Sequence, residues 1–265
     1  MTDKDGRAIA RENEVRVLRA LHRFGWLRTR DLAVLVWQRW ARSPAGEPDL
    51  KPPVPTDAGL RMAQRTLKRL RDKRLVLSSR APDGSVIYAL AEAGARALQQ
   101  IGVAATTGKN LMRSFSSAHY RHRCIANEIA VGSILVGYRV STEREIAQGL
   151  WLGGEDGIAG KKPDVLIRSG DTVWWVEVER SRKNAKDYAR LLQWLGAVAQ
   201  DAFRATGPVL LGEKVCWGKL VFICTPSFQA KLTRDLIAAG WKKIHLDTLL
   251  SFKTSLYKFG DISFS

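Results

Sequence analysis

The sequence has few cysteines, no long apolar run and fewer acidic than basic residues. Its three cysteines, Cys124, Cys216 and Cys224, are scattered without CxxC spacing, which argues against a disulfide framework or a zinc site and favours a reducing compartment. No segment approaches the roughly 18 uninterrupted apolar residues of a membrane span, so we expect no membrane partner. The first residues, MTDKDGRAIARENE, are polar, so we expect no secretory signal and predict a cytoplasmic protein.

The charge balance points to a polyanionic partner. The 265 residues include 43 Lys and Arg against 26 Asp and Glu, which gives a formal net charge of +17 at pH 7. Hydrophobic residues make up 45% of the chain, a normal share for a folded protein, so a wholly disordered chain is excluded. Because nucleic acid is the commonest partner of such a basic protein, we expect double-stranded DNA to be bound.

The densest basic block covers residues 61–74, RMAQRTLKRLRDKR. Apolar residues recur at every third or fourth position from Leu60 to Leu70, which predicts an amphipathic helix with one buried stripe. A basic helix face can simply be solvated, but this spacing also suits contact with phosphates. The predicted DNA-binding face consists of Arg61, Arg65, Lys68 and Arg69.

The order of elements around this helix is informative. Periodicity predicts helices at 10–24 and 29–37 before the basic helix, and two β runs at 75–80 and 85–90 after it. This order resembles a winged helix-turn-helix domain, which we place at residues 1–103. In such domains the third helix enters the major groove and the hairpin contacts the DNA backbone or minor groove, so Arg80 joins the predicted contacts. A winged helix that binds only protein is the alternative.

The rest of the chain predicts a second domain. Residues 104–117 are mostly small and polar, and we expect them to be a linker. From residue 118 to 265 helical and β patterns alternate, so the predicted fold class is α/β (α+β), with helices packed on a mixed sheet. The expected helices of this domain cover 118–135, 183–203 and 226–239, and the expected strands cover 138–146, 163–167, 172–179, 220–224 and 243–246.

Acidic residues cluster on two of these strands. Asp164 opens one strand, and Glu177 lies on the next one after a tight turn, so we expect the two carboxylates to approach each other. Glu179 lies two residues beyond Glu177 and therefore shares its face of the strand. Three carboxylates at one sheet edge repel one another, and they are tolerated beside protein cations or a bound divalent metal.

The segment PDVLI, followed across a turn by VEVERSRK, resembles the PD-(D/E)xK nuclease fold, which implies a restriction-endonuclease-like mixed sheet for this domain. The resemblance implies that Asp164 and Glu177 are metal-binding acids and that Glu128, on the preceding helix, is a third. The implied metal is Mg²⁺ or Mn²⁺, which would assist phosphodiester hydrolysis.

The lysine of this motif is missing. Its position is occupied by Glu179, so Lys183, or else Arg180 or Arg182, would have to supply the positive charge. The resemblance therefore leaves catalysis open. The predicted catalytic residues are Asp164, Glu177, Glu179 and Lys183.

The combination of segments resembles one family in particular. The winged-helix start, the helix SSAHYRHRCIANEIAV, PDVLI and VEVERSRKNAKDYARLLQWL together are similar to the replication-relaxation family of plasmids and conjugative elements, over most of residues 10–200. This implies a DNA-binding accessory protein of replication or mobilisation (relaxosome), with a relaxase or replication protein as partner. Two alternatives stay open: a metal-dependent DNA endonuclease, and a transcription regulator whose second domain senses a ligand or forms a homodimer.

Overall fold

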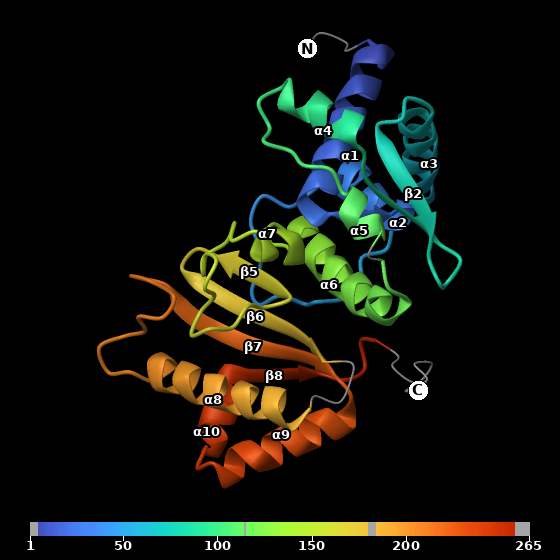
Figure 1. Ribbon diagram of the computed structural model, residues 1–265. Coiled ribbons are helices and arrows are strands. Elements are labelled where there is room, and N and C mark those ends of the chain that lie inside the picture. The colour runs from blue at the N-terminus through green and yellow to red at the C-terminus, as the bar shows by residue number, and fades with distance from the viewer. Residues whose placement is uncertain (1–4, 114, 180–183, 258–265) are drawn as a thin grey trace. The chain divides into compact units, whose positions relative to one another are not determined.

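The computed structural model describes residues 5–113, 115–179 and 184–257. By its internal contacts the chain divides into two compact units. Unit 1 comprises Met1–Arg42 and Pro52–Gly137, and unit 2 comprises Ser43–Lys51 and Tyr138–Ser265. Each unit combines helices with one sheet (Figure 1), so the predicted α/β fold class is confirmed.

Unit 1 has a three-stranded antiparallel sheet in the order β1-β3-β2. Its helices and strands follow the predicted order of helix, helix, basic helix and hairpin, with one addition. The short strand β1 was not predicted, because three residues are too few to show a period. The elements are α1 (Gly6–Phe24), β1 (Trp26–Arg28), α2 (Thr29–Trp37), α3 (Asp57–Asp72), β2 (Val76–Arg80), β3 (Val86–Leu90), α4 (Glu92–Gln99), α5 (Lys109–Arg113) and α6 (Ser117–Leu135).

The basic helix α3 forms where the sequence predicted it. Its N-cap is Thr56, whose hydroxyl oxygen accepts a hydrogen bond from the backbone N–H of Gly59 at 3.1 Å, a contact that satisfies one of the unpaired donors of the first turn. Ala63, Leu67 and Leu70 are buried, which confirms the apolar stripe. The opposite side of α3 therefore carries its charges.

The segment predicted to be a linker packs within unit 1. Residues 104–117 contain α5, and Phe115 lies 6.0 Å from the ring of Trp26 and 5.7 Å from the ring of Tyr120. These aromatic contacts keep the segment and α6 with the first unit, so the long segment of unit 2 begins at Tyr138 and not at residue 118. Small and polar composition indicated a linker, but a few aromatic side chains are enough to hold such a segment on a core.

Unit 2 is built on a five-stranded mixed sheet in the order β4-β5-β6-β7-β8. The β4–β5 and β5–β6 pairs are antiparallel, and the β6–β7 and β7–β8 pairs are parallel. The elements are β4 (Arg139–Ser141), α7 (Glu143–Ala147), β5 (Val165–Ser169), β6 (Thr172–Glu179), α8 (Ala185–Ala202), β7 (Cys216–Cys224), α9 (Pro226–Ala238), α10 (Lys243–Leu249) and β8 (Leu250–Lys253).

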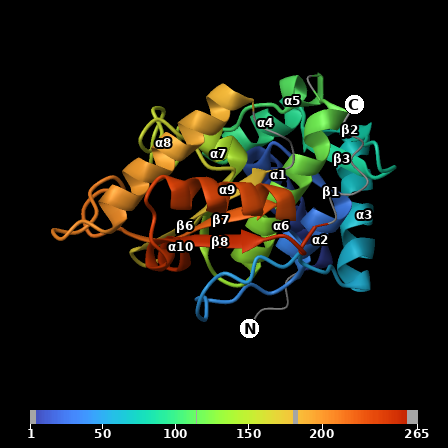
Figure 2. The same ribbon diagram turned by 90° about the horizontal axis from the view of Figure 1, so that it is seen from below.

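One face of this sheet is covered by α8, α9 and α10 (Figures 1 and 2). Trp175 of β6 and Phe222 of β7 are fully buried there and pack with Trp194 of α8 and Leu232 of α9. The rings of Trp175 and Trp194 lie 4.7 Å apart. β6 is the central strand of the unit and pairs with β5 on one side and β7 on the other.

Two predicted strands of unit 2 are helical, one in its second half and the other throughout. The expected strand at 138–146 ends at Ser141, because Thr142 caps α7: its hydroxyl oxygen accepts from the N–H of Glu145, whose carboxylate accepts from the N–H of Thr142. The expected strand at 243–246 is part of α10, and the strand that closes the sheet is β8. In both places the periodicity of the sequence did not distinguish helix from strand, and local capping or sheet pairing determined which one formed.

No helix within the described ranges is both long and apolar enough to cross a membrane.

Candidate nucleic-acid interface and acidic site

The exposed side of α3 carries a row of cations. Arg61, Arg65 and Lys68 are all exposed, and their spacing of four and three residues places them on one side of the helix. Within the described part of the chain, none of the three is paired with a carboxylate. A row of unpaired, solvated cations is available to a ligand that carries several phosphates.

Arg69, the fourth predicted contact on α3, is held differently. The carboxylate of Glu14 on α1, which is buried, accepts from Arg69 Nε at 3.2 Å and from Lys73 Nζ at 2.8 Å. The Arg69 side chain still keeps 41% of its exposure. Arg69 therefore ties α3 to α1, and three of the four predicted side chains on the helix project without such a tie.

The hairpin of unit 1 is fastened by α6. The Tyr120 hydroxyl donates to the Asp83 carboxylate at 2.8 Å and lies 2.8 Å from the Ser85 hydroxyl, and the Tyr120 ring stacks on Trp26 at 5.8 Å. Burial raises the pKa of Tyr120, so this hydroxyl keeps its proton. Arg80, the predicted contact on the hairpin, is exposed at the end of β2. The strand that carries Arg80 therefore leads into the turn that Tyr120 holds through Asp83 and Ser85.

Glu128, predicted from the nuclease resemblance to bind metal, lies on α6 in unit 1. Its carboxylate accepts from Arg28 Nη2 at 2.6 Å, and Arg28 also donates to Asp31 at 2.8 and 3.0 Å. All three residues are buried. Burial opposes the charge of Arg28, but Asp31 and Glu128 raise its pKa above the ordinary value. The structure accounts for Glu128 within unit 1, whereas Asp164 and Glu177 belong to unit 2.

Asp164 and Glu177 are brought together as the sequence predicted. Val165 pairs with Val176 in the antiparallel β5–β6 ladder, so Asp164, one residue before β5, stands opposite Glu177. The N–H of Asp164 donates to the carbonyl of Val176 at 3.0 Å. The Asp164 carboxylate accepts from the N–H of Val178 at 2.7 Å.

Glu177 has an ionic partner that was not predicted. Its Oε1 accepts from Trp175 Nε1 at 2.6 Å and lies 2.6 Å from Lys161 Nζ. Glu177 is 5% exposed. Burial raises the pKa of Glu177, the ammonium of Lys161 opposes that rise, and the charge of Asp164 adds to it. The expected cations, Lys183, Arg180 or Arg182, follow Glu177 in the chain, whereas the lysine that reaches Glu177 lies three residues before Asp164.

Glu179, predicted to be catalytic, is buried at the end of β6. It pairs in register with Cys224 of β7. Burial, with the Glu179 charge in addition, raises the pKa of Cys224 to about 12. Lys183, also predicted to be catalytic, lies outside the described residues together with Arg180 and Arg182.

The acidic pair does not fit the implied Mg²⁺ or Mn²⁺ ion. Over residues 5–113, 115–179 and 184–257, no group of three or more His, Cys, Asp or Glu side chains is placed to hold a metal. In addition, the Glu177 carboxylate already has an ammonium at ion-pair distance. Divalent cations take several oxygen ligands, and the described residues supply too few.

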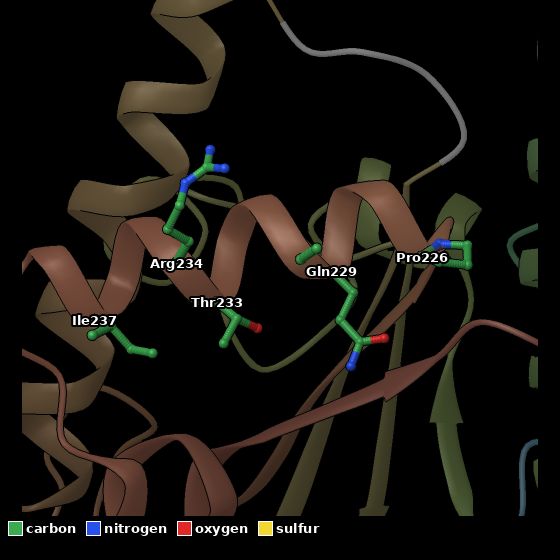
Figure 3. Close-up of a pocket in the computed structure, with 6 residues that line it drawn as sticks. Pro226, Gln229, Thr233, Arg234 and Ile237 are labelled. Atoms are coloured by element: carbon green, nitrogen blue, oxygen red, sulfur yellow. The ribbon is translucent and has the colours of Figure 1, made fainter.

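Two hollows are lined by described residues of unit 2. One, of about 520 Å³, is lined in part by Lys161, Arg190 and Trp194. The other, of about 550 Å³, runs along α9 (Figure 3). Its lining consists of Pro226, Gln229, Ala230, Thr233, Arg234 and Ile237. The second hollow contains none of the predicted site residues.

One family model covers both the basic helix α3 and the acidic pair. A family model described as replication-relaxation matches residues 53–200, more than half of the chain. The matched segment contains α3, the hairpin, α6, the acidic pair and most of α8. No curated protein matches, and no solved structure matches.

Proposed function

Because the chain belongs to the replication-relaxation family, we propose that it is a DNA-binding accessory protein of a plasmid or conjugative element. The family membership supports a role in plasmid replication or mobilisation. We further propose that unit 1 binds DNA as a winged-helix domain. The protein would then act as a component of a relaxosome.

The observation that carries this proposal is the row formed by Arg61, Arg65 and Lys68. These cations are exposed on a helix whose other side is packed into unit 1. A helix of this kind fits the major groove, which is about 12 Å wide. Arg80 on the neighbouring hairpin is a fourth exposed cation for the DNA backbone. Phosphate neutralisation releases counterions, so binding of this kind weakens steeply with salt.

The test compares two variants that each lose three charges. In the first, Arg61, Arg65 and Lys68 on α3 become alanine. In the control, Lys186, Arg204 and Lys243 become alanine; all three are exposed and lie in unit 2. Affinity for a duplex is measured by fluorescence anisotropy across a salt series, with the full chain.

We expect the α3 variant to lose about 100-fold in affinity at low salt and to lower the salt slope by about 2 to 3, since each phosphate contact contributes about 0.9. The control variant should bind nearly as the wild type does. Equal losses in the two variants, or wild-type binding that does not respond to salt, would contradict the proposal.

The endonuclease hypothesis has one observation in its favour: Asp164 and Glu177 lie opposite each other on neighbouring strands. Its test is incubation of supercoiled and branched DNA with Mg²⁺ or Mn²⁺. Cleavage by the wild type that is lost in both Asp164→Ala and Glu177→Ala would establish an endonuclease. We expect DNA to be bound and not cut.

Other parts of the proposal rest on the sequence alone. A relaxase or replication protein as partner, a homodimer and a cytoplasmic location stay predictions, as does the transcription regulator. Light scattering of the purified chain would measure its oligomeric state, and a reporter fused to its own promoter would separate a regulator from a relaxosome component.

A further inference from the structure

The acidic pair of unit 2 stands where a bare negative charge is costly. Glu177 lies on β6, which pairs with β5 on one side and β7 on the other, so its backbone cannot move to bring the carboxylate into water. The carboxylate of Asp164 stands opposite and adds a like charge. A buried carboxylate is tolerated only when a countercharge and hydrogen bonds compensate for the loss of water.

Lys161 is positioned by a closed turn to provide that countercharge. Its backbone N–H donates to the carbonyl of Ile158 at 3.2 Å, and the N–H of Ile158 donates back to the carbonyl of Lys161 at 2.9 Å. Ile158 is itself buried, and its carbonyl accepts from Trp194 Nε1 at 2.9 Å. The turn that carries the lysine is thereby fixed to α8.

The side chain of Lys161 is held as firmly as its backbone. Nζ lies 2.6 Å from Oε1 of Glu177 and 5.5 Å from the centre of the Trp194 ring, an arrangement in which the ring face attracts the ammonium. The lysine side chain keeps only 21% of its exposure. Both the carboxylate and the aromatic ring therefore bind the same ammonium.

We infer that the ammonium of Lys161 is the resident cation of Glu177, and that unit 2 holds the Asp164–Glu177 pair without a divalent metal ion. The Lys161 ammonium supplies the positive charge that a metal ion would otherwise supply at the Glu177 carboxylate. A divalent ion at the same carboxylate would meet the repulsion of the ammonium at close range.

The first experiment measures what the ammonium does for stability. Lys161→Met keeps the aliphatic stem and removes the charge, and Lys162→Met is the matched control, because Lys162 is the adjacent lysine and is exposed. Thermal unfolding of the full chain is followed by tryptophan fluorescence in EDTA. We expect Lys161→Met to lower the midpoint by roughly 5 °C or more and Lys162→Met to change it by about 1 °C or less.

A double variant keeps the test decisive if Lys161→Met folds poorly. Adding Glu177→Gln removes the charge that the lysine balances, so Lys161→Met with Glu177→Gln should recover most of the lost midpoint. If Lys161→Met unfolds like Lys162→Met, or if the double variant is no more stable than Lys161→Met alone, the ammonium does not balance Glu177 and the inference is overturned.

The second experiment asks directly whether metal binds. Titration calorimetry with MnCl₂ compares the wild type with Glu177→Gln, and the two heat profiles should coincide. Saturable Mn²⁺ binding by the wild type that disappears in Glu177→Gln would overturn the inference. Neither experiment involves α3, so its result is independent of whether DNA binding is found.

Discussion

The candidate sites of the two units place their charges in opposite ways. Unit 1 exposes Arg61, Arg65 and Lys68 along one side of a helix, whereas unit 2 buries Glu177 and Glu179 in its central strand. An exposed charge is solvated and contributes little to stability. A buried charge is costly unless it is paired. The contrast shows that the exposed row of cations is available to a large polyanion, whereas the buried acids are part of the packed interior of unit 2.

Unit 1 also contains buried charge, and this provides the largest expected effect. Arg28 stands between Asp31 and Glu128, and Arg28→Met would leave both carboxylates buried without it. We expect a loss of about 3–5 kcal/mol in the free energy of unfolding, measured by urea denaturation. Arg30→Met, two residues further along on α2 and exposed, should change it by about 0.5 kcal/mol or less. Equal effects of the two substitutions would remove the distinction between buried and exposed charge in this unit.

A smaller effect is expected at the tie between α6 and the hairpin. Tyr120→Phe removes the hydroxyl that lies between Asp83 and Ser85, and we expect a loss of about 1 kcal/mol. Amide hydrogen exchange in the β2–β3 hairpin should become faster. Tyr138→Phe is the control, because the Tyr138 hydroxyl donates to the carbonyl of Gly46 within unit 2. Hairpin exchange that is unchanged in Tyr120→Phe would show that α6 does not hold the hairpin.

The smallest effect involves no substitution and compares the units directly. Cys124 in unit 1 and Cys224 in unit 2 are buried, and burial raises the pKa of each thiol to about 12. Cys216 is exposed. Because the thiolate is the reactive form, a thiol reagent at about pH 8 should modify Cys216 alone in the native protein. In moderate urea, the order in which Cys124 and Cys224 become reactive then shows which unit opens first. Native Cys224 or Cys124 that reacts as fast as Cys216 would contradict the burial.

Two features of the fold show where sequence reasoning succeeded and failed. The stripe from Leu60 to Leu70 predicted α3 correctly, because a 16-residue helix repeats its period several times. The segment after Ser141 was wrongly predicted as strand, although Thr142 and Glu145 have the spacing of a capping box. That signal was in the sequence, but the predicted strand was extended through it from residues 138–141.

The contacts of the candidate acidic site were likewise predicted only in part. The opposition of Asp164 and Glu177 follows from a short turn between two strands, which is local information. Neither the pairing of Lys161 with Glu177 nor the pairing of Glu128 with Arg28 could be predicted, because each joins elements whose approach depends on packing. The separation of Arg28 and Glu128 in the chain is one hundred residues.

By itself, the sequence determined the net positive charge, the amphipathic basic helix and the approach of the two acids, since each depends on residues close together in the chain. Tertiary structure decided which charges have partners: it tied Arg69 to Glu14, directed Glu128 to Arg28 and brought Lys161 to Glu177. The physical reason is that an ion pair depends on distance in space and on exclusion of water, and only the packed chain sets both.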